Sequence, residues 1–235
     1  MRSEITKLLI SNLTTFVDEV TSVAIVGGSS TDPEVASLKD LKKDLRFTYF
    51  GIVNENKDLN WFHFDLNSNL NSQSSEKFDL VISCQVLEHV WNINSYFEML
   101  FSLVSPGGFI FVNCPASNFV HGSPDYFSAG YAPNFLVRNL ERVGIMILDS
   151  GSLGSRRYYF LTHIVRRWVR LPELRHPFLN YEILGGSFLG ELKRFIKEIP
   201  SRIYSLFLSP KITNGISYAT ESYVFGRKSK VEGNL

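Results

Sequence analysis

The sequence has few cysteines, almost no net charge and no long apolar run. Its 235 residues include two cysteines, Cys84 and Cys114, without metal-ligand spacing, so we expect no metal site and free thiols in a reducing compartment, the cytoplasm. A formal net charge of +1 gives no electrostatic basis for nucleic-acid binding. No window contains the roughly 18 to 20 apolar residues of a spanning helix, and the N-terminus lacks the apolar stretch of a signal peptide.

What is present is an alternation of apolar runs and amphipathic segments. Residues 3–20 have the spacing of an amphipathic helix, and the run 23–26 predicts a buried strand that ends in the loop Gly27-Gly28-Ser29-Ser30. Asp32 and Pro33 predict the N-cap and first residue of a helix. Further strands are expected at 47–53, 61–64, 78–83, 109–113, 145–148 and 221–226, a turn at 106–108, and helices at 92–104 and 133–143. This alternation predicts a mostly parallel sheet with helices on both faces, which binds ligands beyond the carboxyl ends of its strands.

Two segments closely resemble the motifs of class I S-adenosylmethionine-dependent methyltransferases. Residues 78–90 read FDLVISCQVLEHV and residues 103–115 read LVSPGGFIFVNCP, with a helix of suitable length between them. The resemblance covers residues 20–150 and the last strand. It implies an α/β, Rossmann-like fold: a mostly parallel seven-stranded sheet with helices on both faces and a helical insertion before the last strand. The implied cofactor is S-adenosyl-L-methionine.

The resemblance implies that the loop after the first strand binds the methionine end of the cofactor. Gly27, Gly28 and Ser29 would contact it, because missing side chains let backbone N–H groups approach. The family usually has a G-x-G-x-G loop and an acidic residue in the strand. This sequence departs from that pattern, with Ser29 at the second glycine and Ile25 at the acidic position. Either cofactor binding is weakened, or Ser and Thr hydroxyls and Asp32 replace the missing contacts.

The same resemblance places the ribose and the adenine on the loops after the next two strands. The position for the ribose-binding acid aligns with Val53, so the adjacent Asn54 or Glu55 is expected to accept the ribose hydroxyls, with Glu55 favoured. Asp65, followed by Leu66, matches the aspartate that receives the adenine amino group. The alternative is that Asp65 caps a turn.

The loop after the fourth strand is expected to border both the cofactor and the acceptor. Cys84, Gln85 and His89 are the residues that would line the pocket there. The alternatives are that Cys84 is a small core residue, that His89 is simply packed, and that Glu88 is an N-terminal cap.

Methyl transfer to a hydroxyl requires a positioned acceptor and a group that removes its proton. A histidine with a pKa near neutral suits this role. His121 and His89 are the candidates, and Asp125 is placed to orient His121. The segment around His121 is similar to a stretch in some bacterial methyltransferases linked to sugars and surface polysaccharides. A solvent-facing histidine at 121 and a turn cap at 125 remain the alternatives.

The chain therefore divides into a cofactor-binding core (1–150), an insertion (151–219), and the last strand with a polar tail (220–235). The insertion is too long for a structureless loop, so we expect helices there. Aromatic and arginine side chains between residues 156 and 207 suit a sugar-phosphate, a nucleotide-linked sugar or an acidic lipid head. They equally suit peripheral membrane contact, a layer packed on the core, or a homodimer interface.

The hypothesis is S-adenosylmethionine-dependent methyl transfer to a small-molecule acceptor, such as a sugar, nucleotide sugar or glycan hydroxyl. The alternative is a non-catalytic descendant of the fold that serves as a binding or scaffold module. A nicotinamide-dependent enzyme is disfavoured, because the sequence lacks the G-x-G-x-x-G fingerprint.

Overall fold

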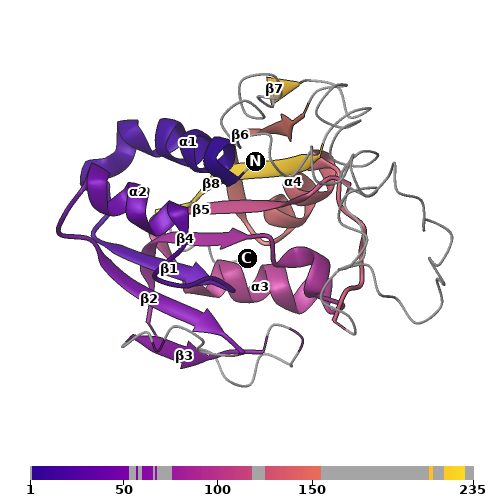
Figure 1. Ribbon diagram of the computed structural model, residues 1–235, viewed down its shortest axis with the longest axis horizontal. Helices are drawn as coiled ribbons and strands as arrows, with labels where there is room; N and C mark the ends of the chain where they lie inside the picture. Colours follow the sequence, from indigo (N-terminus) through magenta and orange to yellow (C-terminus); the bar gives the residue numbers. More distant parts are fainter. Residues whose placement is uncertain are drawn as a thin grey trace, which may run out of the picture.

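The protein forms one mixed sheet between two layers of helices (Figure 1). The computed structural model describes residues 2–52, 57, 60–65, 67, 76–117, 125–154, 212–213 and 220–230. The helices are α1 (Arg2–Leu13), α2 (Pro33–Leu41), α3 (Ile93–Leu103) and α4 (Pro133–Arg142), with the 3₁₀ helices η1 (Thr14–Glu19) and η2 (Leu87–His89). The strands are β1 (Ser22–Val26), β2 (Arg46–Gly51), β3 (Trp61–His63), β4 (Phe78–Cys84), β5 (Val104–Pro115), β6 (Ile145–Leu153), β7 (Ile212–Thr213) and β8 (Glu221–Lys228).

The strand order is β3-β2-β1-β4-β5-β8-β6-β7. The ladders from β3 to β5 are parallel, whereas β8 runs antiparallel between β5 and β6. This confirms the mostly parallel seven-stranded sheet, to which the two-residue β7 adds a further edge strand. The chain moves outward from β1 to β2 and β3, then returns to β4 on the other side of β1. The loops after β1 and β4 therefore adjoin at the point where the strand order reverses, which is where such sheets bind ligands.

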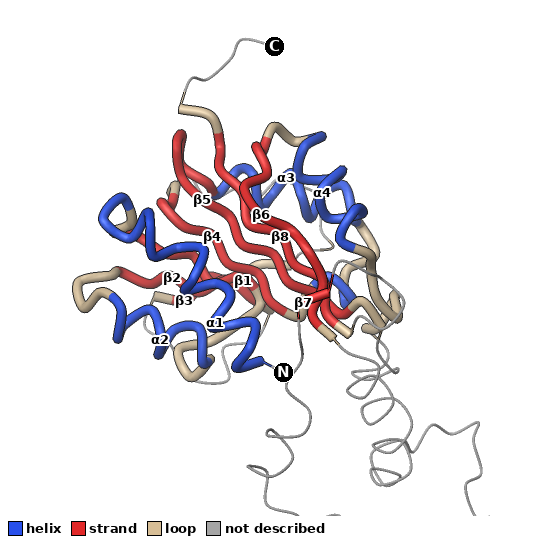
Figure 2. The backbone as a smooth tube through the Cα atoms, turned by 90° about the horizontal axis from the view of Figure 1, so that it is seen from above, coloured by secondary structure: helices blue, strands red, loops and turns tan. Residues whose placement is uncertain are grey.

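Each face of the sheet is covered by its own pair of helices. Figure 2 shows α1 and α2 on one face and α3 and α4 on the other. Ile5 and Leu9 of α1 pack with Val35 and Leu38 of α2 and the strand residues of their face. On the opposite face, α3 and α4 pack over a separate apolar cluster. The alternation of side chains along each strand supplies both clusters.

Two local features differ from the sequence-based expectation. The helix expected over 3–20 ends at Leu13 and continues as η1, and the Thr14 hydroxyl donates to the Ile10 carbonyl, a bond that competes with the helical pattern. The turn expected at 106–108 lies inside β5, as an irregularity in the ladder between β4 and β5. Gly107 has φ +78° there, a conformation that favours glycine.

Candidate active site at the carboxyl ends of the strands

The glycine loop after β1 packs directly against the loop after β4. Gly27 has φ +74°, and its N–H donates to the Phe50 carbonyl at 2.7 Å. A methyl group at Gly27 would overlap Cγ2 of Val86 and lie 3.1 Å from Cγ1 of the same side chain. Only glycine combines this backbone conformation with this close approach. We call this tight turn the glycine cradle; it lies at the carboxyl end of β1, where the methionine end of the cofactor is predicted to bind.

Asp32 holds the rest of this loop. It occupies the predicted N-cap position of α2, but its side chain makes no capping bond to that helix. Instead, its Oδ2 accepts the Ser29 N–H at 2.9 Å, and the Ser29 and Thr31 hydroxyls lie 3.0 Å apart. A methyl group at Gly28 would lie 2.5 Å from the same Asp32 oxygen. Side chains of the loop thus shape the turn in place of the second family glycine.

Ile25, at the position where the family has an acid, is 4% exposed within the core. It packs in the apolar cluster on the α1 and α2 face of the sheet. An apolar side chain at this place therefore contributes packing to the strand beneath the glycine loop.

Asp65 belongs to a hydrogen-bonded chain that connects the loops after β3 and β4. Its Oδ1 accepts the Asn67 N–H at 2.9 Å. Asn67 in turn donates to the His89 carbonyl at 3.3 Å and accepts the Trp91 N–H at 2.8 Å. The turn-capping alternative for Asp65 is thus present in the structure, and the adenine role stays a prediction alongside it.

Gln85 lies at the end of β4 in a backbone conformation that is rare for a side-chain-bearing residue, with φ +59°. Its N–H donates to the Asn113 carbonyl at 2.9 Å. Its Nε2 donates to Asn113 Oδ1 at 2.8 Å and to Glu221 Oε2 at 2.6 Å. Neither Asn113 nor Glu221 was among the predicted site residues. Asn113 had a signal in the sequence, as a polar residue inside an apolar run, whereas Glu221 stands at the start of its strand and had none.

His89 lies against the segment that follows β5. Its Nδ1 contacts the backbone carbonyl oxygen of Asp125, and its ring meets the Tyr126 ring edge-on with centroids 5.9 Å apart. The carbonyl of Glu88 accepts the N–H groups of Phe127 and Ser128 at 2.8 and 3.3 Å. The loop after β4 therefore holds the segment 125–128 at the edge of the site.

Glu88, for which an N-terminal cap was the alternative, is fully buried in η2. Burial raises the pKa of Tyr126, and the Glu88 carboxyl raises it further. Burial also raises the pKa of Cys114, with Glu88 the next cause. Cys84 is half-buried at the end of β4, where it packs against the cluster on the α1 and α2 face.

Several predictions lie outside the described residues. Asn54, Glu55, Leu66 and His121 are among them, so the predicted ribose contacts and the role of Asp125 in orienting His121 stay predictions. Of the insertion at 151–219, the structure describes 151–153, which complete β6, the next residue, Gly154, and the strand β7. None of the described helices is long and apolar enough to cross a membrane.

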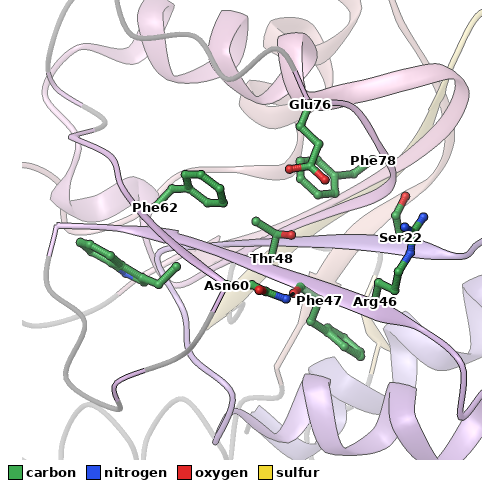
Figure 3. Close-up of a pocket in the computed structure, with 9 residues that line it drawn as sticks. Ser22, Arg46, Phe47, Thr48, Asn60, Phe62, Glu76 and Phe78 are labelled. Atoms are coloured by element: carbon green, nitrogen blue, oxygen red, sulfur yellow. Dashed lines mark hydrogen bonds between the residues drawn. The ribbon is translucent and has the colours of Figure 1, made fainter.

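A cavity of about 280 Å³ lies at the amino ends of the parallel strands, on the side of the sheet away from the glycine loop. Ser22 and Arg46, the first residues of β1 and β2, line it together with Phe78, which begins β4 (Figure 3). Figure 3 also shows Thr48 and Phe47 on opposite sides of the strand. Because this cavity adjoins the amino ends of the parallel strands, it is separate from the predicted cofactor site.

The strand order, the glycine turn after β1 and the adjoining loop after β4 define an α/β domain of the class that binds a nucleotide-like ligand at the switch point of its sheet. Comparison with known proteins identifies the family. Residues 13–177 match the sequence profile of the methyltransferase domain, which covers more than half of the chain. The chain therefore belongs to the class I S-adenosylmethionine-dependent methyltransferase family.

Individual relatives are distant. A mitochondrial ubiquinone biosynthesis O-methyltransferase from Dictyostelium discoideum is 31% identical over 84 residues, a match that covers 36% of this chain and 25% of that protein. A SAM-dependent methyltransferase from Archaeoglobus fulgidus has a similar fold, with a TM-score of 0.54 at 13% identity over 97% of this chain and 95% of that one. Coclaurine N-methyltransferase, solved with N-methylheliamine and SAH, has a TM-score of 0.58 at 13% identity over 97% and 72%.

Proposed function

We propose that this protein transfers the methyl group of S-adenosylmethionine to a hydroxyl group of a small molecule. The glycine turn at Gly27 carries the proposal, because its left-handed backbone packs tightly on Val86 at the point where the strand order of the sheet reverses. The match to an O-methyltransferase of ubiquinone biosynthesis supports oxygen as the methylated atom. The arginine-rich and aromatic insertion supports a sugar-linked hydroxyl as one class of acceptor, with membrane contact or a homodimer as further proposals for it.

In this function the cofactor supplies an activated methyl group, and the protein positions the acceptor. Gly27, Gly28 and Ser29 hold the methionine end, and Asp65 receives the adenine amino group. Gln85 and His89 line the place where the acceptor enters. Because the sulfur leaves without needing a proton, the protein's chemical task is confined to orienting the acceptor oxygen and accepting its proton.

Calorimetric titration with S-adenosylmethionine and S-adenosylhomocysteine tests the cofactor part of this proposal. We expect micromolar binding in the wild-type protein. A well-folded protein that binds neither compound would contradict the proposal and favour a non-catalytic binding module.

A matched pair of variants separates the two roles of Asp65. Asp65→Asn keeps an oxygen that accepts the Asn67 N–H, whereas Asp65→Ala removes it. In Asp65→Asn, an NH₂ group replaces the second carboxylate oxygen, and this group cannot accept a hydrogen bond from the adenine amino group. If Asp65 binds adenine, both variants weaken binding about tenfold, or about 1.4 kcal/mol. If only Asp65→Ala weakens it, Asp65 is a turn cap alone.

A further inference from the structure

Polar side chains from three neighbouring strands meet at the carboxyl edge of the central sheet. Gln85 follows β4, Asn113 lies in β5, and Glu221 begins β8. The Asn113 Nδ2 donates to Glu221 Oε2 at 3.1 Å and to the Ser222 carbonyl at 3.0 Å, and Gln85 Nε2 donates to the same Glu221 oxygen at 2.6 Å. Among the described residues, both amide groups thus donate to Oε2, and Oε1 can accept a hydrogen bond from a further donor.

The Glu221 carboxyl group is buried, and its burial destabilises the folded protein when the group is ionised. Glu221 is 4% exposed and Asn113 is 1% exposed. Burial raises the pKa of Glu221 to about 8, the hydrogen bonds from Asn113 and Gln85 oppose that rise, and the nearby Glu88 carboxyl adds to it. The folded-state pKa of Glu221 lies above its unfolded-state pKa. The fold therefore loses stability as the pH rises from the unfolded-state pKa to the folded-state pKa.

The position of the cluster suits the proposed reaction. The carboxyl end of β4 is next to the glycine loop after β1, because the two strands pair in parallel from Leu80 to Ser83 of β4, and β5 follows on the far side of β4. Gln85, the member of this cluster that follows β4, directly precedes Val86, whose side chain packs against Gly27. The carboxyl group thus lies at the same end of the parallel strands as the glycine turn, with β4 and β5 between them, and it contacts the loop after β4 through Gln85.

We propose that Glu221 binds the acceptor hydroxyl through Oε1 and takes its proton during methyl transfer, while Gln85 and Asn113 position the carboxylate. In this step the acceptor O–H bond breaks and its proton goes to Glu221. The acceptor oxygen forms a bond to the methyl carbon, the carbon–sulfur bond breaks, and its electron pair stays on the sulfur. This inference rests on the proposed function, and it adds a proton acceptor that does not come from a histidine.

Glu221→Gln provides the test, because it keeps the size and hydrogen-bonding capacity of the side chain but does not accept the proton. The probes are catechol and methyl glucoside, with radiolabelled S-adenosylmethionine as methyl donor. We expect wild-type turnover of at least one probe, with kcat rising through a pH of about 8. Glu221→Gln should lower kcat about 100-fold or more and abolish that rise. Its affinity for S-adenosylhomocysteine should stay within about twofold of wild type, well under the 1.4 kcal/mol of a tenfold change.

Asp149→Asn is the matched control. The Asp149 carboxylate also accepts hydrogen bonds from a neighbouring amide and a hydroxyl, those of Asn12 and Tyr223, but it lies in β6 away from the strand ends. The turnover and pH profile of the Asp149→Asn protein should match those of wild type. Glu221→Asp should recover part of the pH-dependent rise.

Three outcomes would overturn the proposal. The first is a folded Glu221→Gln protein with wild-type kcat at every pH. The second is an equal loss of cofactor affinity and kcat, which would assign Glu221 a structural role beneath the cofactor. The third is a wild-type protein that binds the cofactor but methylates neither probe. Absence of cofactor binding by the wild-type protein is a different result, because it rejects the proposed function itself.

Discussion

Replacing Gly27 by alanine is the sharpest test of the glycine cradle. The residue has φ +74°, and left-handed backbone costs an alanine about 1 to 2 kcal/mol. The new methyl group also overlaps the Val86 side chain, and relieving such an overlap in a packed region costs about 1 to 3 kcal/mol more. The loop must therefore move, and we expect affinity for S-adenosylmethionine to fall at least tenfold, or about 1.4 kcal/mol.

Gly144→Ala separates backbone strain from the effect on the site. Gly144 has φ +93° after α4, so it carries a similar backbone cost. A methyl group there meets only the Phe101 ring, at 3.5 Å, which is ordinary contact. Gly144→Ala should lower the free energy of unfolding by about 1 to 2 kcal/mol and leave cofactor affinity unchanged.

Calorimetry and urea denaturation measure the two quantities. A double-mutant cycle of Gly27→Ala with Val86→Ala should show a favourable coupling of about 1 to 2 kcal/mol, since the smaller side chain removes the overlap but not the strain. The reasoning fails if folded Gly27→Ala protein binds the cofactor with wild-type affinity, because the turn would then not be the cradle.

Two further predictions concern stability. Asp79→Ala removes four hydrogen bonds that the Asp79 carboxylate accepts from Thr21 and Ser22, and it should cost about 1 to 2 kcal/mol at neutral pH. Burial acts to raise the pKa of Asp79, but these bonds outweigh it and lower the pKa. The stabilisation is therefore present above the unfolded-state pKa and is lost as the pH falls through the lower folded-state value. Denaturation curves of the two proteins should converge in acid, and a constant difference would contradict this. Tyr96→Phe should cost about 1 kcal/mol, because the buried hydroxyl donates to Ser83 at 2.8 Å, and an unchanged unfolding midpoint would show that this bond contributes nothing.

The periodicity of the sequence was sufficient for most of the fold. Each predicted strand overlaps an observed one, because the spacing of apolar residues along the chain follows the face that each strand or helix buries. The motif at 78–90 placed β4 and its loop correctly, and Gly144 follows α4 as predicted. The split after Leu13 was missed, since weak local hydrogen bonds such as that of Thr14 determine where the helical pattern ends.

The candidate site depended more on tertiary structure. Gly27 was identifiable from its place after an apolar run, but its need for glycine comes from Val86, 59 positions further along the chain. The sequence indicated Asp32 as a helix cap, and the fold turned its carboxylate toward the loop instead. Unlike Asn113, Glu221 carried no local signal, because its partner Gln85 is 136 residues away and is brought to it by the pairing of β4 with β5 and of β5 with β8. Local pattern thus determined the elements, whereas the order in which they pair decided which polar groups share the site.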